Sequence, residues 1–226
     1  MNIFGLIAEG ITDQIAIENI LVGYFNNPDI DVNFLQPLRD ETGSDRAENY
    51  GGWSQVIEYC QSPKFRNAFK FNQYVIIQID TDVSQDWNAP YTVSHRDENG
   101  ELTPEQLIEK VIEMLVGLIE EDFYQQHQER IIFAISVHSI ECWFLPLYYS
   151  DNRKAEITNC LERLNRELAK KEKFTIDAKK PKYYRRISKK YIKHKILMKH
   201  YQENPSLKRF IEFIESRNII IETEDF

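Results

Sequence analysis

The chain has 226 residues and a formal net charge of −8, with 42% hydrophobic and 12% aromatic residues. This composition excludes an intrinsically disordered chain, and the length allows one domain with an appendage or two small domains. The charge is unevenly distributed, because residues 1–150 carry 8 Lys/Arg against 24 Asp/Glu and residues 151–200 carry 17 against 6. An acidic body with one basic block predicts that the block faces an anion and that the body binds cations.

The cysteines and the N-terminus restrict the class of protein further. Cys60, Cys142 and Cys160 form no C-x-x-C pair and are odd in number, which argues against a disulfide framework and against a structural zinc site. The N-terminal apolar run has no basic lead and reaches a charge at Glu9, too early for a signal peptide or a membrane span. We therefore expect a cytoplasmic protein without membrane attachment.

The first predicted unit is a strand over residues 2–8, a turn at Glu9 and Gly10, and an amphipathic helix. Thr12 or Asp13 is the expected N-cap of this helix. Glu9 projects from the carboxyl end of the strand, and Gly10 allows the backbone to turn sharply beside it. Asp13 is interpreted either as a helix cap or as a ligand to a second metal ion.

The next segments are a predicted strand over residues 32–38 and two long polar loops, residues 39–52 and 83–103. Loops of this length inside a compact domain are more often functional than idle. After the second loop, Pro104 opens a predicted helix that ends near Phe123.

The central strand is predicted within residues 74–84, where a nearly unbroken β-branched apolar run ends at Asp80. Such a run is typical of a strand that is buried on both faces of a parallel sheet. Asp82 follows two positions later, so both carboxylates point to the same side at the carboxyl end of the strand. Their mutual repulsion and the preference of Mg²⁺ for carboxylate and phosphate oxygens make the pair a candidate cation site; the alternative is a solvated turn.

A fourth apolar strand is predicted over residues 131–137, and His138 and Glu141 follow it. Glu141 is an acid in an apolar, aromatic stretch at a strand-to-helix junction. A buried Glu needs a partner, and the candidates are the acids named above or a Lys or Arg. His138 is a candidate donor to substrate, but a structural histidine with satisfied hydrogen bonds is the favoured interpretation.

The C-terminal part of the chain is predicted to be helical and basic. One helix is expected over residues 157–168, and a last helix capped by Ser206 precedes a short edge strand at residues 219–221. Between these helices, residues 170–201 (the basic segment) interleave Lys and Arg, which neutralise phosphates, with Tyr, which stacks on bases. The alternative is a solvated face that balances the acidic body. The residues expected to contact nucleic acid are Lys179, Lys180, Lys182, Tyr183, Tyr184, Arg185, Arg186, Lys189 and Lys190.

The order of these acids along the chain resembles that of the Toprim fold. A strand leads to Glu9 and Gly10, a later strand to Asp80 and Asp82, and a further strand to Glu141. In this family, which includes topoisomerases, bacterial primases and overcoming-lysogenisation-defect nucleases, a glutamate after the first strand and a later Asp-x-Asp hold Mg²⁺ or Mn²⁺. The resemblance implies the same role for Glu9, Asp80 and Asp82.

Two further features carry the resemblance. Asp13 resembles the extra acid of two-metal nuclease members, and residues 139–145 are similar to an Ile-Glu-x-Trp-Leu segment of small bacterial Toprim proteins from mobile-element and anti-phage loci. The resemblance covers residues 1–150, for which it implies a Toprim-like catalytic domain with a mainly parallel sheet of about four strands flanked by helices. Residues 151–226 are expected to form a basic helical extension packed on it. The Lys or Arg that Toprim nucleases often use near the site has no evident counterpart.

The expected activity is Mg²⁺- or Mn²⁺-dependent hydrolysis of phosphodiester bonds in DNA or RNA, as an effector of anti-phage defence. Asp80 and Asp82 would hold the ion, which activates water and neutralises charge on phosphorus. Glu9 is expected to be a ligand or a general base acting through a bound water, and Glu141 a further ligand or an orienting group. The resemblance leaves open an ATPase or regulatory partner and a homodimer.

Three other hypotheses use the same residues differently. A metal-dependent nucleotide-sugar transferase also has a strand-end Asp-x-Asp and would make Glu9 incidental. A haloacid-dehalogenase phosphatase is less favoured, because its Asp-x-Asp normally follows the first strand. The third hypothesis is a Toprim-like module without activity, in which the basic segment docks a partner protein.

Overall fold

Four parallel strands form the central sheet of the computed structural model, which describes residues 2–39, 52–82, 92–177 and 179–221. The strands of this sheet are β1 (Asn2–Ile7), β2 (Val32–Gln36), β3 (Asn72–Asp80) and β6 (Ile131–Ser136). The α-helices are α1 (Ile11–Phe25), α2 (Trp53–Gln61), α3 (Pro63–Ala68), α4 (Pro104–Ile119), α5 (Glu121–His127), α6 (Cys160–Lys171), α7 (Pro181–Ser188), α8 (His194–His200) and α9 (Pro205–Ser216). The short 3₁₀ segments are η1 (Gln128–Arg130), η2 (Ile140–Leu147), η3 (Asn152–Ala155), η4 (Lys189–Ile192) and η5 (Tyr201–Glu203).

The strand order in the sheet is β2-β1-β3-β6, and every neighbouring pair is parallel. Ile7 at the end of β1 lies opposite Ile77 of β3, and Asp80 at the end of β3 lies opposite Ser136 of β6. The carboxyl ends of the strands therefore meet at one edge of the sheet. The predicted α/β architecture, a parallel sheet of four strands flanked by helices, is confirmed.

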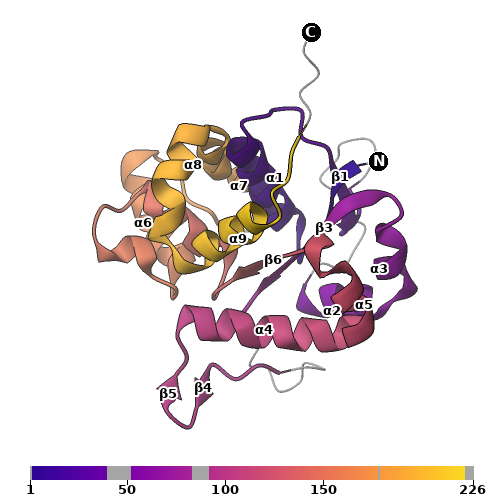
Figure 1. Cartoon of the computed structure of the whole chain (residues 1–226). Helices are drawn as coiled ribbons and strands as arrows, with labels where there is room; N and C mark the ends of the chain where they lie inside the picture. Colours follow the sequence, from indigo (N-terminus) through magenta and orange to yellow (C-terminus); the bar gives the residue numbers. More distant parts are fainter. Residues whose placement is uncertain (1, 40–51, 83–91, 178, 222–226) are drawn as a thin grey trace.

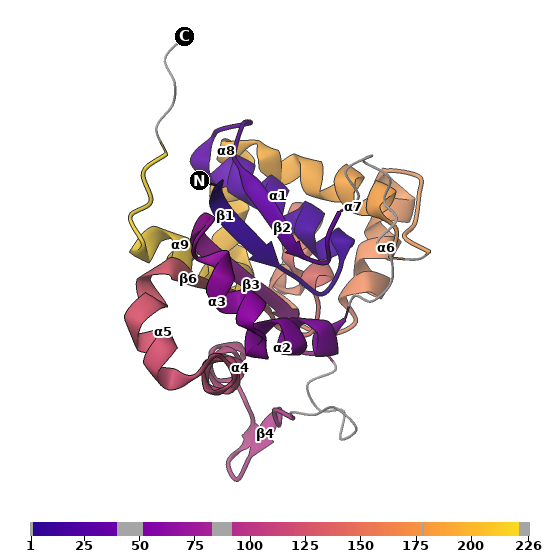
Figure 2. The ribbon, with the colours of Figure 1, turned by 90° about the vertical axis from the view of Figure 1, so that its right-hand side faces the viewer.

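A layer of helices covers each face of the sheet (Figures 1 and 2). Successive side chains of a strand point to opposite faces, so Ile76 packs with α1 and the C-terminal helices while Ile77 packs with α2 and α4. The first of these cores contains residues from both the 1–150 and the 151–226 parts of the chain. The basic C-terminal part therefore builds one of the two layers, and α7 and α8 both contact α1.

The starts of two helices differ from the sequence prediction. The N-cap of α1 is Gly10, and Thr12 and Asp13 lie inside the first turn with buried side chains. The N-cap of α9 is Asn204, whose side-chain oxygen accepts a hydrogen bond from the Leu207 N–H at 3.1 Å. The expected caps were wrong because the sequence alone does not distinguish an N-cap from a buried polar residue within the first turn of the same helix.

The remaining elements are close to their expected positions, with three differences. The predicted helix from Pro104 ends at Ile119, and Glu120, with φ of 75°, separates it from α5. Residues 219–221 do not form the predicted edge strand. The element of the C-terminal part that contacts β6, the last strand of the sheet, is the helix α9. Most of the first predicted loop, residues 40–51, and the start of the second, residues 83–91, lie outside the described residues. The rest of the second loop contains a hairpin of β4 (Arg96–Asp97) and β5 (Gly100–Glu101).

The prediction against disulfides was wrong. Cys142 in η2 and Cys160 at the start of α6 are joined by a disulfide, whereas Cys60 is free and buried. An odd cysteine count does not reveal that folding brings two distant cysteines to a Cα separation of 4.9 Å. Among the described helices, none combines the length and the apolar character that crossing a membrane requires.

Candidate functional site

Glu9 and Asp80 meet at the carboxyl ends of the neighbouring strands β1 and β3. A carboxylate oxygen of Glu9 accepts a hydrogen bond from the backbone N–H of Asp80 at 2.6 Å. Gln78 joins the two residues a second time, since its side-chain oxygen accepts from the Glu9 N–H and its amide nitrogen donates to Asp80, both at 3.0 Å. Gln78 was missed by the sequence prediction, although a Gln within an apolar β-branched run is a usable signal for such a role.

Asp13 approaches the same strand ends from the first turn of α1. Its side chain is 2% exposed, and one carboxylate oxygen accepts a hydrogen bond from the Thr12 hydroxyl at 3.1 Å. The other oxygen, Oδ1, is buried and has no hydrogen-bond partner within the described parts of the chain. A Cβ atom on Gly10 would lie 2.9 Å from the Asp13 carboxylate. The absence of a side chain at Gly10 therefore allows Asp13 to lie this close to the turn.

Asp82 lies at the exposed rim, where the ends of β3 and β6 are joined by backbone contacts. Its N–H donates to the His138 carbonyl at 3.0 Å, and the His138 N–H donates to the Thr81 hydroxyl at 2.8 Å. His138 has φ of 68°, in the left-handed region that few non-glycine residues adopt. Its ring atom Nδ1 is buried, and none of the described residues forms a hydrogen bond with it, so the expectation of a histidine with satisfied hydrogen bonds was wrong.

Glu141 enters the site from η2 and is held by the C-terminal layer. The hydroxyl group of Tyr184, from α7, donates a hydrogen bond to the Glu141 carboxylate. Both residues are at most 1% exposed. Burial, the charge of Glu141 and this hydrogen bond raise the pKa of Tyr184 well above its ordinary value, so the phenol keeps its proton. The hydrogen-bond partner of Glu141 is therefore a tyrosine, which the sequence prediction did not consider. The predicted kinds of partner, other acids and a lysine, also interact with Glu141 through their charges.

A lysine from the basic segment lies among these acids, which we call the acid cluster: Glu9, Asp13, Asp80 and Glu141. The Nζ atom of Lys179 is 3.8 Å from Oδ2 of Asp80, which is itself buried. Burial alone would lower the pKa of Lys179, but the charges of Asp80 and the three other acids raise it above its ordinary value. Sequence reasoning assigned Lys179 to nucleic-acid binding and found no basic residue for the acid site.

The crowding of the carboxylates changes how readily they lose their protons. Burial, followed by the charge of Asp13, raises the pKa of Glu9 to about 8. Burial raises the pKa of Asp13 to about 6 although the charge of Lys179 opposes the change. The pKa of Asp80 is also raised, by burial and then by the charges of Asp13 and Glu9. Positive charge added to this cluster would favour ionisation of all three acids.

The donor set has the chemistry of a Mg²⁺ or Mn²⁺ site, since it consists of carboxylate oxygens. Asp13 Oδ1 and Asp80 Oδ2 are buried oxygens of the cluster for which residues 2–39, 52–82, 92–177 and 179–221 supply no hydrogen-bond donor. Among the residues that the structure describes, no three Asp, Glu, His or Cys side chains are yet arranged around a common ion position. The residues therefore fit the ion by the chemistry of their oxygens.

A cavity of about 510 Å³ opens beside the acid cluster. Its walls combine the strand ends with the start of α6 and with the basic segment, through Asp82, His138, Glu141, Asn159, Cys160 and Lys179 among others. This volume falls within the range of small-ligand sites, and the cavity therefore offers room for a substrate group next to the acids.

The two tyrosines that were expected to stack on bases have other positions. Tyr184 is fully buried against Glu141, so a base cannot stack on its ring. Tyr183 is partly buried and its ring is stacked on Phe174, with centroids 6.1 Å apart. The expectation for Tyr184 was wrong because regular spacing along a helix does not reveal which face is buried.

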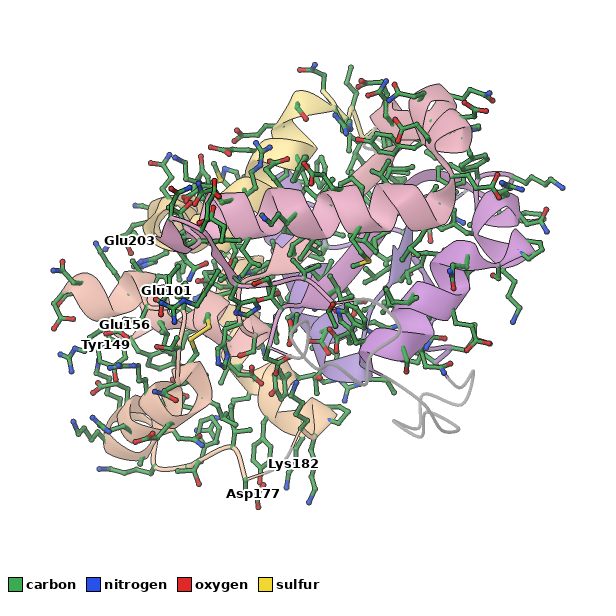
Figure 3. The ribbon with its side chains drawn as sticks, turned by 90° about the horizontal axis from the view of Figure 1, so that it is seen from below. Glu101, Tyr149, Glu156, Asp177, Lys182 and Glu203 are labelled. Atoms are coloured by element: carbon green, nitrogen blue, oxygen red, sulfur yellow. A yellow bond between two sulfur atoms is a disulfide. The ribbon has the colours of Figure 1, made fainter. Side chains whose placement is uncertain are left out.

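Several cations of the basic segment form ion pairs within the protein, and some of these are also exposed. Glu172 binds Lys190 at 2.5 Å and lies 3.6 Å from Arg186, so these two cations are partly neutralised within the protein. Figure 3 shows Lys182 at the outside of the molecule, pointing away from it. The exposed cations on and around α7 are Lys179, Lys180, Lys182, Arg185, Arg186 and Lys189.

Comparison of the chain with protein-family models, with curated proteins and with solved structures found no match. The resemblance to the Toprim fold therefore stays a prediction. The chemistry of the site has to be inferred from the positions of its residues.

Proposed function

We propose that the protein is a divalent-metal-dependent nuclease of Toprim-like fold that hydrolyses phosphodiester bonds in DNA or RNA. The observation that carries this proposal is the convergence of Glu9, Asp13, Asp80 and Glu141 at one edge of the sheet, with Lys179 among them. Buried acids that repel one another lower the stability of the fold, and such an arrangement is typical of functional sites. A role in anti-phage defence belongs to the same proposal.

The proposed ligands of the metal are Glu9, Asp80 and Asp82, with Asp13 for a second ion. When bound, a divalent ion supplies the charge that stabilises the transition state of phosphoryl transfer and lowers the pKa of water. Glu9 has a pKa raised to about 8 in the metal-free protein, so it retains a proton near neutral pH that a bound ion would displace. Glu141, fixed by the Tyr184 hydroxyl, serves to orient the neighbouring groups.

The substrate backbone is proposed to follow the exposed cations of the basic segment toward the acid cluster. Lys179 connects the two regions, because it lies in the basic segment and contacts Asp80. Lys180 and Lys182 lie one and three positions after it and are exposed. A phosphate near these cations would be close to the acids that hold the metal ion.

Of the other hypotheses, the nucleotide-sugar transferase makes Glu9 incidental. The hydrogen bonds that join Glu9 to Asp80 and Gln78 favour the nuclease over this transferase. The non-enzymatic module stays a second hypothesis, since the basic segment also offers a face for an acidic partner.

The nuclease proposal is tested with purified protein, Mg²⁺ or Mn²⁺, and single- and double-stranded DNA and RNA. We expect metal-dependent cleavage, and we expect Glu9→Gln and Asp80→Asn each to reduce it about 100-fold or more. Glu109→Gln is the matched control, since Glu109 is an exposed acid on α4 that pairs with Arg209. Undiminished cleavage by the Glu9→Gln/Asp80→Asn double variant would contradict the proposal. Failure to bind either metal by calorimetry would favour the non-enzymatic module.

A further inference from the structure

Lys179 places one positive charge beside the acid cluster, but its ammonium group does not donate a hydrogen bond to Asp80. The 3.8 Å between Nζ and Asp80 Oδ2 is a charge contact that is too long for a hydrogen bond. Among the residues that the structure describes, Asp80 Oδ2 and Asp13 Oδ1 have no hydrogen-bond donor, although both residues are at most 2% exposed. Two buried oxygens that face a positive charge without a hydrogen bond are ligand positions that a small hard cation could fill at about 2.0–2.1 Å.

The side chain of Lys179 can leave the cluster without disturbing the elements on either side. On the N-terminal side, Ile176 is 3% exposed and fixed to Asn165 by two hydrogen bonds of 2.6 and 2.8 Å. On the C-terminal side, α7 begins at Pro181 and is held by Tyr184. The Lys179 side chain itself is 54% exposed. Rotation of this side chain alone would carry the ammonium group into solvent.

The present arrangement and a metal-bound arrangement exclude each other. A divalent ion bound to Oδ2 of Asp80 would lie close to the position of the ammonium group, and two cations at such a distance repel strongly in a buried site. The absence of a ready three-ligand set among the described residues agrees with an acid cluster arranged around a lysine.

We propose that the ammonium group of Lys179 holds the place of the divalent cation and turns outward when the ion binds. This inference rests on the proposed metal-dependent function. In the outward position Lys179 joins the exposed Lys180 and Lys182, on the side where the nucleic-acid backbone is proposed to lie. Metal binding thereby adds a cation to the substrate-binding face, and one lysine couples the two binding events.

The protein is treated with a lysine-acetylating reagent in two samples, one containing EDTA and one containing saturating Mn²⁺. The acetylation of each lysine is then quantified by mass spectrometry. We expect acetylation of Lys179 to increase several-fold with Mn²⁺, because its ammonium group leaves the acids. Lys180 and Lys182 are the internal controls and should react equally in both samples, since both are exposed.

Mn²⁺ calorimetry on the wild type and on Lys179→Gln completes the test. We expect tighter Mn²⁺ binding by Lys179→Gln, with Lys182→Gln unchanged, because only Lys179 competes with the ion. If Mn²⁺ binds the wild type but the reactivity of Lys179 stays constant or falls, this inference is overturned and the nuclease proposal stands. If Mn²⁺ binds neither protein, both are overturned.

Discussion

The carboxylate of Glu9 accepts a hydrogen bond from the backbone N–H of Asp80, and this contact joins the ends of two neighbouring strands. The donor is a main-chain group, so the position of Glu9 does not depend on the side chain of Asp80. A Gln at position 9 keeps an acceptor oxygen for this hydrogen bond while removing the charge. The pair therefore allows charge to be changed with little change in geometry.

The first prediction concerns the stability of the metal-free protein as a function of pH. The pKa of Glu9 is raised from 4.5 to about 8, so the folded state binds its proton more tightly than the unfolded state. Ionisation of Glu9 therefore destabilises the fold, and stability falls as the pH rises from about 4.5 to about 8. The measurement is urea unfolding in EDTA at several pH values. Glu9→Gln should flatten the decline, and equal slopes for the two proteins would contradict the assignment.

The second prediction concerns the hydrogen bond between Tyr184 and Glu141. Tyr184→Phe removes the donor and leaves a buried carboxylate without its partner, so we expect a loss of about 1–3 kcal/mol in the free energy of unfolding. The control is Tyr183→Phe, which removes the same group from a partly buried ring and should change stability by less than about 0.5 kcal/mol. Equal effects of the two variants would show that the buried contact is unimportant.

The third prediction concerns the contact between α1 and η4. A Cβ atom at Gly23 would lie 1.8 Å from the backbone oxygen of Tyr191, so Gly23→Ala must push the C-terminal layer away from α1. We expect a loss of about 1–3 kcal/mol or more. Gly117→Ala in α4 is the control, because nothing lies within 4 Å of its added Cβ. There the better helix propensity of Ala should stabilise by about 0.5–1 kcal/mol. Thermal or urea unfolding measures both.

The fourth prediction concerns the disulfide that joins η2 to α6. Peptide mapping without reduction should show Cys142 linked to Cys160, with Cys60 as the free thiol. Removing the link with Cys160→Ala should cost about 3 kcal/mol, since the closed loop spans a sequence separation of 18. Cys60→Ala keeps the link and should cost less, through the loss of one buried side-chain atom. An unlinked Cys142 in freshly purified protein would contradict this pairing.

The fifth prediction concerns the exposed cations of α7 and its neighbourhood. Replacing Lys182 and Lys189 with Gln should weaken nucleic-acid binding, because both are exposed cations of the basic segment. The slope of log affinity against log salt should become less steep by about one to two units. Lys64→Gln/Lys110→Gln changes two exposed lysines on α3 and α4, in the other helical layer. Binding that responds equally to the two double variants would place the nucleic acid elsewhere.

Glu9, Asp80 and Glu141 could be found from the sequence because each follows an apolar run with a clear end. In a parallel sheet the ends of such runs lie at one edge, so position along the chain predicts proximity in space. The strand count and the parallel arrangement followed from the same runs. Local pattern was therefore sufficient for these three acids, whereas Asp13 lies in the first turn of a helix and follows no such run.

Lys179 and Tyr184 could not be placed in the site from the sequence. Their contacts with Asp80 and Glu141 depend on how the C-terminal helices pack on α1, and no local pattern encodes this packing. Tyr183 and Tyr184 are adjacent in a basic helix, yet Tyr184 is buried and Tyr183 is only partly buried. The disulfide between Cys142 and Cys160 could not be predicted for the same reason, because it also depends on tertiary packing.

The contribution of α7 to the acid cluster has a consequence for the order of events during synthesis. Translation releases the N-terminal part of a chain first, so Glu9, Asp80 and Glu141 emerge well before Lys179 and Tyr184. A ribosome-bound intermediate that ends before α7 has the acids but neither the ammonium group nor the phenol that hold them. The candidate site is therefore completed only after α7 has been synthesised and has packed against the acids.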